Sequence, residues 1–263
     1  MVRRVVLPLA VTVLLLLPAL SHAYDAASLV VASTGSLPLI LTVPHDGGDS
    51  IGLVRIRSTG AVVRDAGTRA LAERIAEILE ARLGQRPYLV IAGFSRKYLD
   101  ANRPQAQAME APEALPAYLA YHDRIAAYVA EVKRRFPAGA VLVDVHGQSG
   151  DRETTFRGTQ SGATTRALLQ RFGPAAIQGE KSLIGVLAAQ GFRVFPPVGA
   201  ESLGEDPRYA GGYTVQAYGS SRDSGIDAIQ LEFGRSHRDD PRLPQSVAQA
   251  LITFMTEYQL LPR

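Results

Sequence analysis

Two histidines and one glutamate are the residues of this chain whose types and spacing point most directly to chemistry. His45 and His146 each end a short apolar run, and Glu232 lies inside a third; the runs are 37–44, 141–145 and 229–233. Aliphatic and β-branched runs that stop at a polar residue near a glycine are typical of buried parallel strands. Such strands deliver side chains to the carboxyl edge of the sheet, where open α/β folds bind ligands. We therefore expect one metal site with a base beside it.

The chain contains no cysteine, so any metal must be held by nitrogen and oxygen ligands. His45 and His146 are the candidate nitrogen ligands. Asp65 directly precedes an amphipathic segment, and the residues alone favour a helix N-cap there over a ligand. Asp46 and Asp49 compete for the role of carboxylate ligand, although aspartate beside glycine is also typical of turns. The choice among the three aspartates stays open at this point.

Two acidic residues flank the expected site. Asp144 and His146 alternate along one predicted strand, so they share a face, and the carboxylate is placed to orient the imidazole. Glu232 lies between apolar neighbours, where an ionised carboxylate is costly unless it is paired. A general base acting on water at the metal would explain its presence. A salt bridge to Arg235 is the alternative.

A polar segment lies between these runs. Asn102 and Arg103 follow Arg96 and precede Pro104, which disfavours helix in the residue before it. Guanidinium groups bind carboxylates in a bidentate manner, so this segment predicts a clamp for a substrate carboxylate. A surface loop is the alternative interpretation.

The elements that must position these residues alternate along the chain. Amphipathic periodicity predicts helices over 66–83, 116–136, 164–172, 181–190 and 243–258. Strands are predicted over 29–33, 37–43, 88–92, 140–145, 192–195 and 228–233. In the second helix we expect Leu119, Ile125, Val129 and Val132 to face inward. This alternation predicts a single α/β domain whose largely parallel sheet is covered on both faces.

The first residues differ in character from the rest. A pair of arginines precedes an apolar stretch, and Ser21-His22-Ala23 fits a small-x-small cleavage site. We predict a secretory signal peptide over 1–23, cleaved before Tyr24, with the hydrolase domain over 24–263. An uncleaved membrane anchor is the alternative. No later segment is apolar over a length that could span a bilayer.

Charge excludes one class of partner. The 28 basic and 25 acidic residues give a formal net charge of +3. Basic side chains form no stripe interleaved with aromatic residues, so we do not expect nucleic acid binding.

Taken in order, a set of short motifs resembles the N-formylglutamate amidohydrolase family, which is related to the zinc carboxypeptidases and the aspartoacylase-like deacylases. The motifs are Val43-Pro44-His45-Asp46-Gly47, Arg64-Asp65, Ser95-Arg96, Asp100-x-Asn102-Arg103, Tyr121-His122, Asp144-x-His146, Gly211-Gly212-Tyr213 and Gln230-Leu231-Glu232.

The resemblance implies a phosphorylase/hydrolase-like fold, a three-layer α/β/α domain with a mostly parallel mixed sheet and one bound Zn²⁺. It carries the zinc ligands over to His45, Asp65 and His146. The carboxypeptidases have their carboxylate ligand three residues after the first histidine, and Gly48 stands at that position here. This departure moves the expected ligand to Asp65, with Asp46 and Asp49 kept as alternatives.

The resemblance also implies roles for the remaining motifs. Asn102 and Arg103 match the family's substrate clamp, and Arg96 matches an upstream arginine expected to stabilise the oxyanion. Glu232 matches the late-strand base. Tyr213 resembles a mobile-loop tyrosine that covers the substrate.

These predictions combine into one function. We expect an exported zinc-dependent hydrolase, periplasmic or secreted, that cleaves an amide bond in a small carboxylate-bearing substrate. The candidate substrates are an N-acyl amino acid, a peptide trimmed at its C-terminus, and a γ-glutamyl or cell-wall peptide. The alternative is a non-catalytic protein that binds acidic ligands through Arg96, Asn102 and Arg103.

Overall fold

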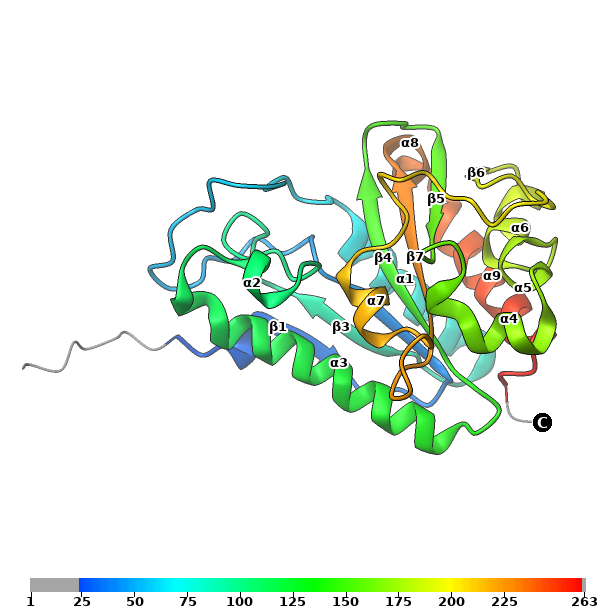
Figure 1. Ribbon diagram of the computed structural model, residues 1–263, viewed down its shortest axis with the longest axis horizontal. Coiled ribbons are helices and arrows are strands. Elements are labelled where there is room, and N and C mark those ends of the chain that lie inside the picture. The colour runs from blue at the N-terminus through cyan, green and yellow to red at the C-terminus, as the bar shows by residue number, and fades with distance from the viewer. Residues whose placement is uncertain (1–23, 262–263) are drawn as a thin grey trace, which may run out of the picture.

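The computed structural model describes residues 24–261, so the predicted signal peptide over 1–23 lies outside the described residues. At its centre is a seven-stranded sheet in the order β1-β3-β2-β4-β7-β5-β6 (Figure 1). Its strands are β1 (Val30–Ser33), β2 (Leu39–Val43), β3 (Tyr88–Ala92), β4 (Val141–Gln148), β5 (Thr154–Gly158), β6 (Arg193–Phe195) and β7 (Asp227–Gly234). The β1–β3 and β5–β7 pairs are antiparallel and the other pairs are parallel. The predicted α/β class with a mostly parallel mixed sheet is confirmed.

Helices cover both faces of the sheet. They are α1 (Thr68–Leu83), α2 (Gln105–Ala108), α3 (Leu115–Arg135), α4 (Arg166–Phe172), α5 (Ala175–Gln178), α6 (Leu183–Ala189), α7 (Tyr213–Tyr218), α8 (Arg235–Asp239) and α9 (Leu243–Glu257). Short 3₁₀ turns lie at Ala27–Leu29, Pro112–Ala114 and Ala163–Thr165. In Figure 1, α3 and α7 lie over one face, and α1 and α9 lie over the other.

The strand β2 shows why two cores form. Its side chains alternate between the faces of the sheet. Leu39, Leu41 and Val43 pack with α1, α6 and α9, whereas Ile40 packs with α3. Because both faces are apolar and covered, the ends of the central strands are held at fixed positions. Among the described residues, no helix is long and apolar enough to cross a membrane.

One expectation about the core is wrong. Leu119 is 41% exposed, whereas Ile125, Val129 and Val132 are buried as predicted. The buried stripe of α3 begins at Tyr118, seven residues before Ile125. Leu119 lies one position off this stripe, about 100° around the helix, and therefore faces outward.

The strand β5 was not predicted. It pairs antiparallel with β7 and parallel with β6, and all five of its residues are buried. Its sequence, Thr-Thr-Phe-Arg-Gly, has neither apolar alternation nor an apolar run. A buried arginine, Arg157, lies within it.

Candidate active site

Three residues of the expected site, His45, His146 and Glu232, lie near the ends of the central strands. His45 comes two residues after β2, and His146 lies near the end of β4. In the parallel pairing of β4 with β7, His146 lies opposite Glu232, and Asp144 lies opposite Gln230. The register of these two strands therefore places the imidazole and the glutamate side by side.

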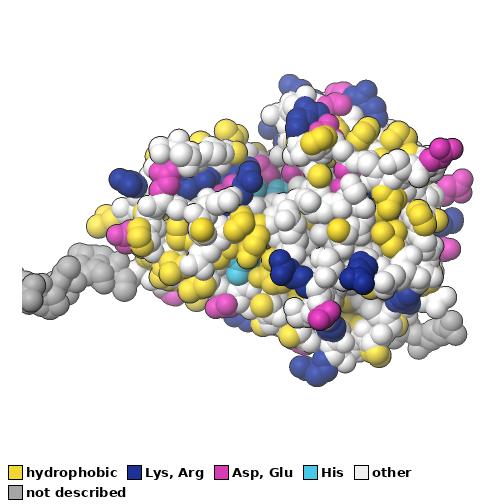
Figure 2. All heavy atoms as spheres, viewed as in Figure 1, with side chains coloured by type: hydrophobic (Ala, Val, Ile, Leu, Met, Phe, Trp, Pro, Cys, Tyr) yellow, Lys and Arg dark blue, Asp and Glu magenta, His cyan; other side chains and the backbone are white. Residues whose placement is uncertain are grey.

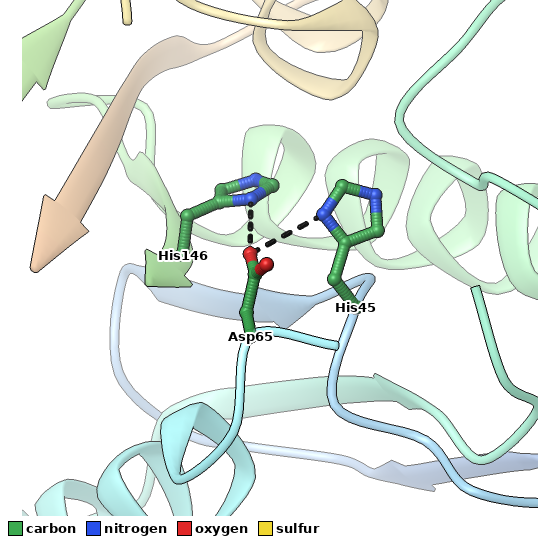
Figure 3. Close-up of side chains that lie close together, drawn as sticks. All are labelled: His45, Asp65 and His146. Carbon is green, nitrogen blue, oxygen red and sulfur yellow. Dashed lines mark hydrogen bonds and ion pairs between the residues drawn. The ribbon is translucent and has the colours of Figure 1, made fainter. Parts of the chain in front are cut away.

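The side chains of His45, Asp65 and His146 point toward one another (Figure 3). The Asp65 Oδ2 atom lies 3.4 Å from His45 Nδ1 and 3.2 Å from His146 Nδ1. All three residues are buried, and one candidate ligand atom from each lies within 4.8 Å of the others. The centroids of the two imidazole rings are 4.9 Å apart. The two histidines thus converge on one point, as a shared cation requires.

The outer nitrogens of both rings are held by carboxylates. His45 Nε2 lies 2.7 Å from Asp100 Oδ1, and His146 Nε2 lies 2.8 Å from Asp144 Oδ2. A carboxylate accepts a hydrogen bond from Nε2–H, so each Nδ1 presents a lone pair toward Asp65.

This arrangement fits a divalent metal. His45 Nδ1 is buried and has no hydrogen-bond partner among the described residues. Two nitrogen lone pairs aimed at a carboxylate oxygen repel it unless a positive charge lies between them. Two imidazole nitrogens and one carboxylate are a usual ligand set for catalytic zinc, and they leave one coordination position open.

The three candidate aspartates have different surroundings in the structure. Asp65 is the one that lies with the histidines. Asp46 Oδ2 accepts a hydrogen bond of 2.8 Å from the Arg69 backbone N–H, and its other oxygen pairs with Arg64. Asp46 therefore caps the start of α1, the role that local sequence favoured for Asp65. Asp49 is exposed in the loop.

The pKa of Asp65 reflects its neighbours. Burial acts to raise this pKa, but the adjacent imidazoles of His146 and His45 outweigh burial and hold it well below its usual range. Asp65 is therefore an ionised carboxylate, the form that binds a metal.

Glu232 lies beside this cluster. Its Oε1 atom is 3.8 Å from His146 Nδ1 and accepts a hydrogen bond of 3.0 Å from the Gln230 carboxamide. Burial raises the pKa of Glu232, although the neighbouring His146 opposes that rise. The alternative salt bridge is not formed, because Arg235 pairs with Asp239 instead. A carboxylate with a raised pKa near a metal site has the properties of a general base.

The predicted clamp residues have different environments. Arg96 donates two hydrogen bonds to Asp100 Oδ2, at 3.1 and 3.0 Å, and its Nη1 lies 3.6 Å from Asp65. The Arg103 side chain is 55% exposed, and its Nε is 4.0 Å from Asp100 Oδ2. The Asn102 carboxamide accepts a hydrogen bond of 2.7 Å from the Thr214 backbone N–H, so it holds the start of α7. Arg103 therefore presents the most available cation of the three.

A pocket of about 590 Å³ opens over the cluster. Figure 2 shows histidine and acidic side chains at the bottom of a hollow on this face. All eight predicted site residues line it: His45, Asp65, Arg96, Asn102, Arg103, His146, Tyr213 and Glu232.

One protein-family model matches part of the chain. The family model described as N-formylglutamate amidohydrolase matches residues 115–237, the stretch that carries His146, Tyr213 and Glu232. The resemblance to that family is confirmed. This match supports an amide-hydrolysing enzyme. No curated protein matches the chain.

Two solved structures share the fold. The crystal structure of N-formylglutamate amidohydrolase from Ralstonia eutropha JMP134 is 15% identical, with a TM-score of 0.54, and the match covers 88% of this chain and 97% of that one. A gene product from Agrobacterium tumefaciens is 16% identical, with a TM-score of 0.55, and coverage of 89% and 93%. At these identities the likeness shows the fold alone.

Tyr213 packs against His122 of the Tyr121-His122 motif, next to the segment that carries Asn102 and Arg103. The His122 ring lies 5.5 Å from the Tyr213 ring, its Nε2 is 3.0 Å from the Ala101 carbonyl, and its Nδ1 is 3.0 Å from the Tyr218 hydroxyl. Burial lowers the pKa of His122 to about 4. A neutral imidazole therefore ties the backbone beside Asn102 to α3 and α7.

Several residues in or directly behind the pocket were not among the predicted site residues. Asp100 holds His45, and Gln230 holds Glu232. Both residues lie inside motifs of the family resemblance, and these motifs were the only sequence signal that could have identified them. The outer pocket is lined by polar residues with no local sequence signal, among them Gln107, Gln160, Arg208, Tyr209 and Gln216.

Proposed function

We propose that this chain is a zinc-dependent hydrolase that cleaves an amide bond in a small substrate bearing a carboxylate, either an N-acyl amino acid or a peptide. The observation that carries the proposal is the convergence of His45 Nδ1, His146 Nδ1 and the Asp65 carboxylate beside Glu232. The match to the N-formylglutamate amidohydrolase family supports the amidohydrolase class.

His45, Asp65 and His146 would hold the metal, and Asp100 and Asp144 would fix the two rings. Bound zinc supplies a Lewis acid and lowers the pKa of water to about 7.

Glu232 accepts the proton of the attacking water and returns it to the leaving amine. Gln230 holds the carboxylate in place for both transfers. A raised pKa suits this double role, since the base must release the proton as readily as it accepts it.

The arginines act on the substrate. Arg96 stabilises the negative charge that develops on the carbonyl oxygen, since its Nη1 faces the cluster while Nε and Nη2 bind Asp100. Arg103 binds the substrate carboxylate, Asn102 holds the adjoining wall, and Tyr213 covers the bound substrate.

We further propose that the protein is exported to the periplasm or secreted, on the basis of the predicted signal peptide over 1–23. Fractionation of cells that produce the full chain checks this proposal, and retention of the uncleaved chain in the cytoplasm would contradict it.

The test of the activity combines metal analysis with a substrate screen. The purified chain should contain one zinc and hydrolyse an N-acyl amino acid or a short peptide, and a chelator should abolish hydrolysis until zinc is restored. Hydrolysis that survives complete metal removal would overturn the zinc mechanism. A chain that binds acidic ligands but neither binds zinc nor cleaves an amide would be a binding protein instead.

A further inference from the structure

Among the residues that the structure describes, the pocket offers one available positive charge. Three arginines line it, and two of them are neutralised by near neighbours. Arg96 is bonded to Asp100, and Arg208 is bonded to both oxygens of Asp206, at 2.9 and 2.6 Å. Arg103 has no carboxylate oxygen nearer than 4.0 Å among the described residues. The pocket therefore suits a substrate anchored by a single carboxylate.

A second wall of the pocket is neutral and rich in amides. The side-chain Nε2 groups of Gln160 and Gln216 both donate to the Gly211 carbonyl, the latter at 3.0 Å. Their Oε1 atoms have no hydrogen-bond partner among the described residues, and both side chains belong to exposed residues. Carboxamide oxygens accept hydrogen bonds, so this glutamine pair presents two acceptors suited to peptide N–H groups.

The backbone at Gln160 is held in place by a buried ion pair. Gln160 has a φ of 51°, in the left-handed region that non-glycine residues rarely adopt. The flanking Thr159 and Ser161 backbone N–H groups donate to Glu205, which pairs with Arg157 at 2.9 Å. The surrounding contacts therefore impose a strained backbone at the pocket wall, as is common at binding sites.

The anchor and the glutamine pair lie on the same side of the pocket, because Gly212, next to the Gly211 that binds the pair, packs against Asn102 beside Arg103. Arg103 is beside Asp100, which holds His45. The segment that bears Gly211 continues to Gly212, whose N–H donates to Gln230 at 2.7 Å, next to Glu232. A substrate anchored at Arg103 can therefore place its amide groups along the glutamine pair.

We propose that the substrate is an acylated peptide with one anchoring carboxylate, whose remaining amide groups lie along Gln160 and Gln216. This inference rests on the proposed function and names its substrate class. The volume of about 590 Å³ falls in the range of about 300 to 1,000 Å³ typical of drug-sized ligands, so a single acylated amino acid fills only part of it. For an acylated dicarboxylic amino acid, the described part of the pocket also offers no second available cation to bind the other carboxylate.

In the cleavage, water adds to the carbonyl carbon and the C–N bond breaks. The fragment held by Arg103 leaves as a free amine, which takes its proton from Glu232. The acyl fragment leaves as a new carboxylate. Atoms and charge balance with water as the only co-reactant.

The first experiment compares N-acetyl-L-glutamate with an N-acetyl tripeptide of neutral side chains and one C-terminal carboxylate. We expect kcat/KM to be at least about 10-fold higher for the tripeptide, the effect of one or two added hydrogen bonds. An equal or higher kcat/KM for N-acetyl-L-glutamate would overturn this inference and leave the proposed function standing.

The second experiment changes the glutamine pair. Gln216→Ala should lower the ratio of the two kcat/KM values by about 5-fold. Gln160→Asn, which shortens the side chain and tolerates the left-handed backbone, should act in the same direction. Gln245→Ala, exposed on α9, is the matched control and should leave both values unchanged. An unchanged ratio in both pair variants would contradict the inference.

Binding is measured separately from turnover. Calorimetry of the zinc-loaded Glu232→Gln variant should show tighter binding of the tripeptide than of N-acetyl-L-glutamate. If the wild-type chain cleaves neither compound but this preference remains, the proposed function fails while the recognition of peptides stands. Equal affinities would reject the recognition of peptides.

Discussion

Two parts of the pocket are built in different ways. We call them the floor, formed by His45, Asp65, His146 and Glu232, and the outer wall, formed by the segments that carry Gln160, Gly211 and Gln216. On the floor, His146 and Glu232 are placed by the β4–β7 register, and each imidazole has a carboxylate within 2.8 Å of its Nε2. The outer wall consists of loops and the short helix α7, its glutamines are exposed, and one buried ion pair holds it. Rigid strands therefore position the reacting groups, and the loops select the substrate. Changes to the floor should affect turnover, and changes to the wall should affect stability and selectivity.

The largest expected effect comes from the floor. Glu232→Gln keeps the side-chain shape but removes the proton acceptor, so kcat should fall by about 10²- to 10⁴-fold. Zinc content should stay at the wild-type level. Glu257→Gln, at the exposed end of α9, is the control and should keep full activity. Full activity of Glu232→Gln would remove the assignment of the base.

The second largest effect is expected from the Arg157–Glu205 ion pair, which supports the outer wall. Glu205→Gln leaves the Arg157 guanidinium buried without a charged partner, which should lower the free energy of unfolding by about 3 to 5 kcal/mol. Urea denaturation measures this change. Glu201→Gln, exposed in a neighbouring loop, should change it by no more than about 0.5 kcal/mol. Similar values for the two variants would show that the ion pair does not support the wall.

A third prediction concerns pH. An unfolded histidine takes up a proton near pH 6.5, whereas the pKa of buried His122 is lowered to about 4. The unfolded state therefore binds more protons between these values. The contribution of His122 to stability is complete above pH 6.5 and falls as the pH drops toward 4, by up to about 3 kcal/mol.

Denaturation of wild-type and His122→Gln chains across pH 4 to 7 checks the effect. The variant should lose this part of the pH dependence. Identical pH profiles for the two chains would show that His122 is not the group responsible.

The smallest effect is expected for Asp100, which acts on the metal only through the expected ligand His45. Asp100→Asn weakens the hydrogen bond that fixes the His45 ring and should lower zinc affinity by about 10- to 100-fold. Competition with a chelating dye measures the affinity. Asp123→Asn, exposed on α3, is the control, and equal affinities for the two variants would contradict the role of Asp100.

Local sequence patterns predicted much of the floor. Apolar runs that end in polar residues placed His45, His146 and Glu232 at neighbouring strand ends, and alternation placed Asp144 with His146. The choice of Asp65 could not come from local pattern, because an aspartate before a helix is also a typical cap. The resemblance pointed to Asp65, and the structure shows that the Asp46 carboxylate accepts the hydrogen bond from the first turn of α1.

The outer wall could not be predicted in the same way. β5 has polar residues and a buried arginine, and it forms because Arg157 meets Glu205, 48 residues further along the chain. The glutamine pair is brought together by one carbonyl, that of Gly211, to which both side chains donate. Such long-range contacts leave no periodic signal in the sequence.

The most direct test of the metal site is a crystal structure of the zinc-loaded protein with anomalous diffraction at the zinc edge. It should show one zinc per chain, bound by Nδ1 of His45, Nδ1 of His146 and a carboxylate oxygen of Asp65, at about 2.0 to 2.2 Å. Zinc bound elsewhere, or a His45→Ala/His146→Ala double variant that keeps the wild-type zinc affinity, would contradict the shared site.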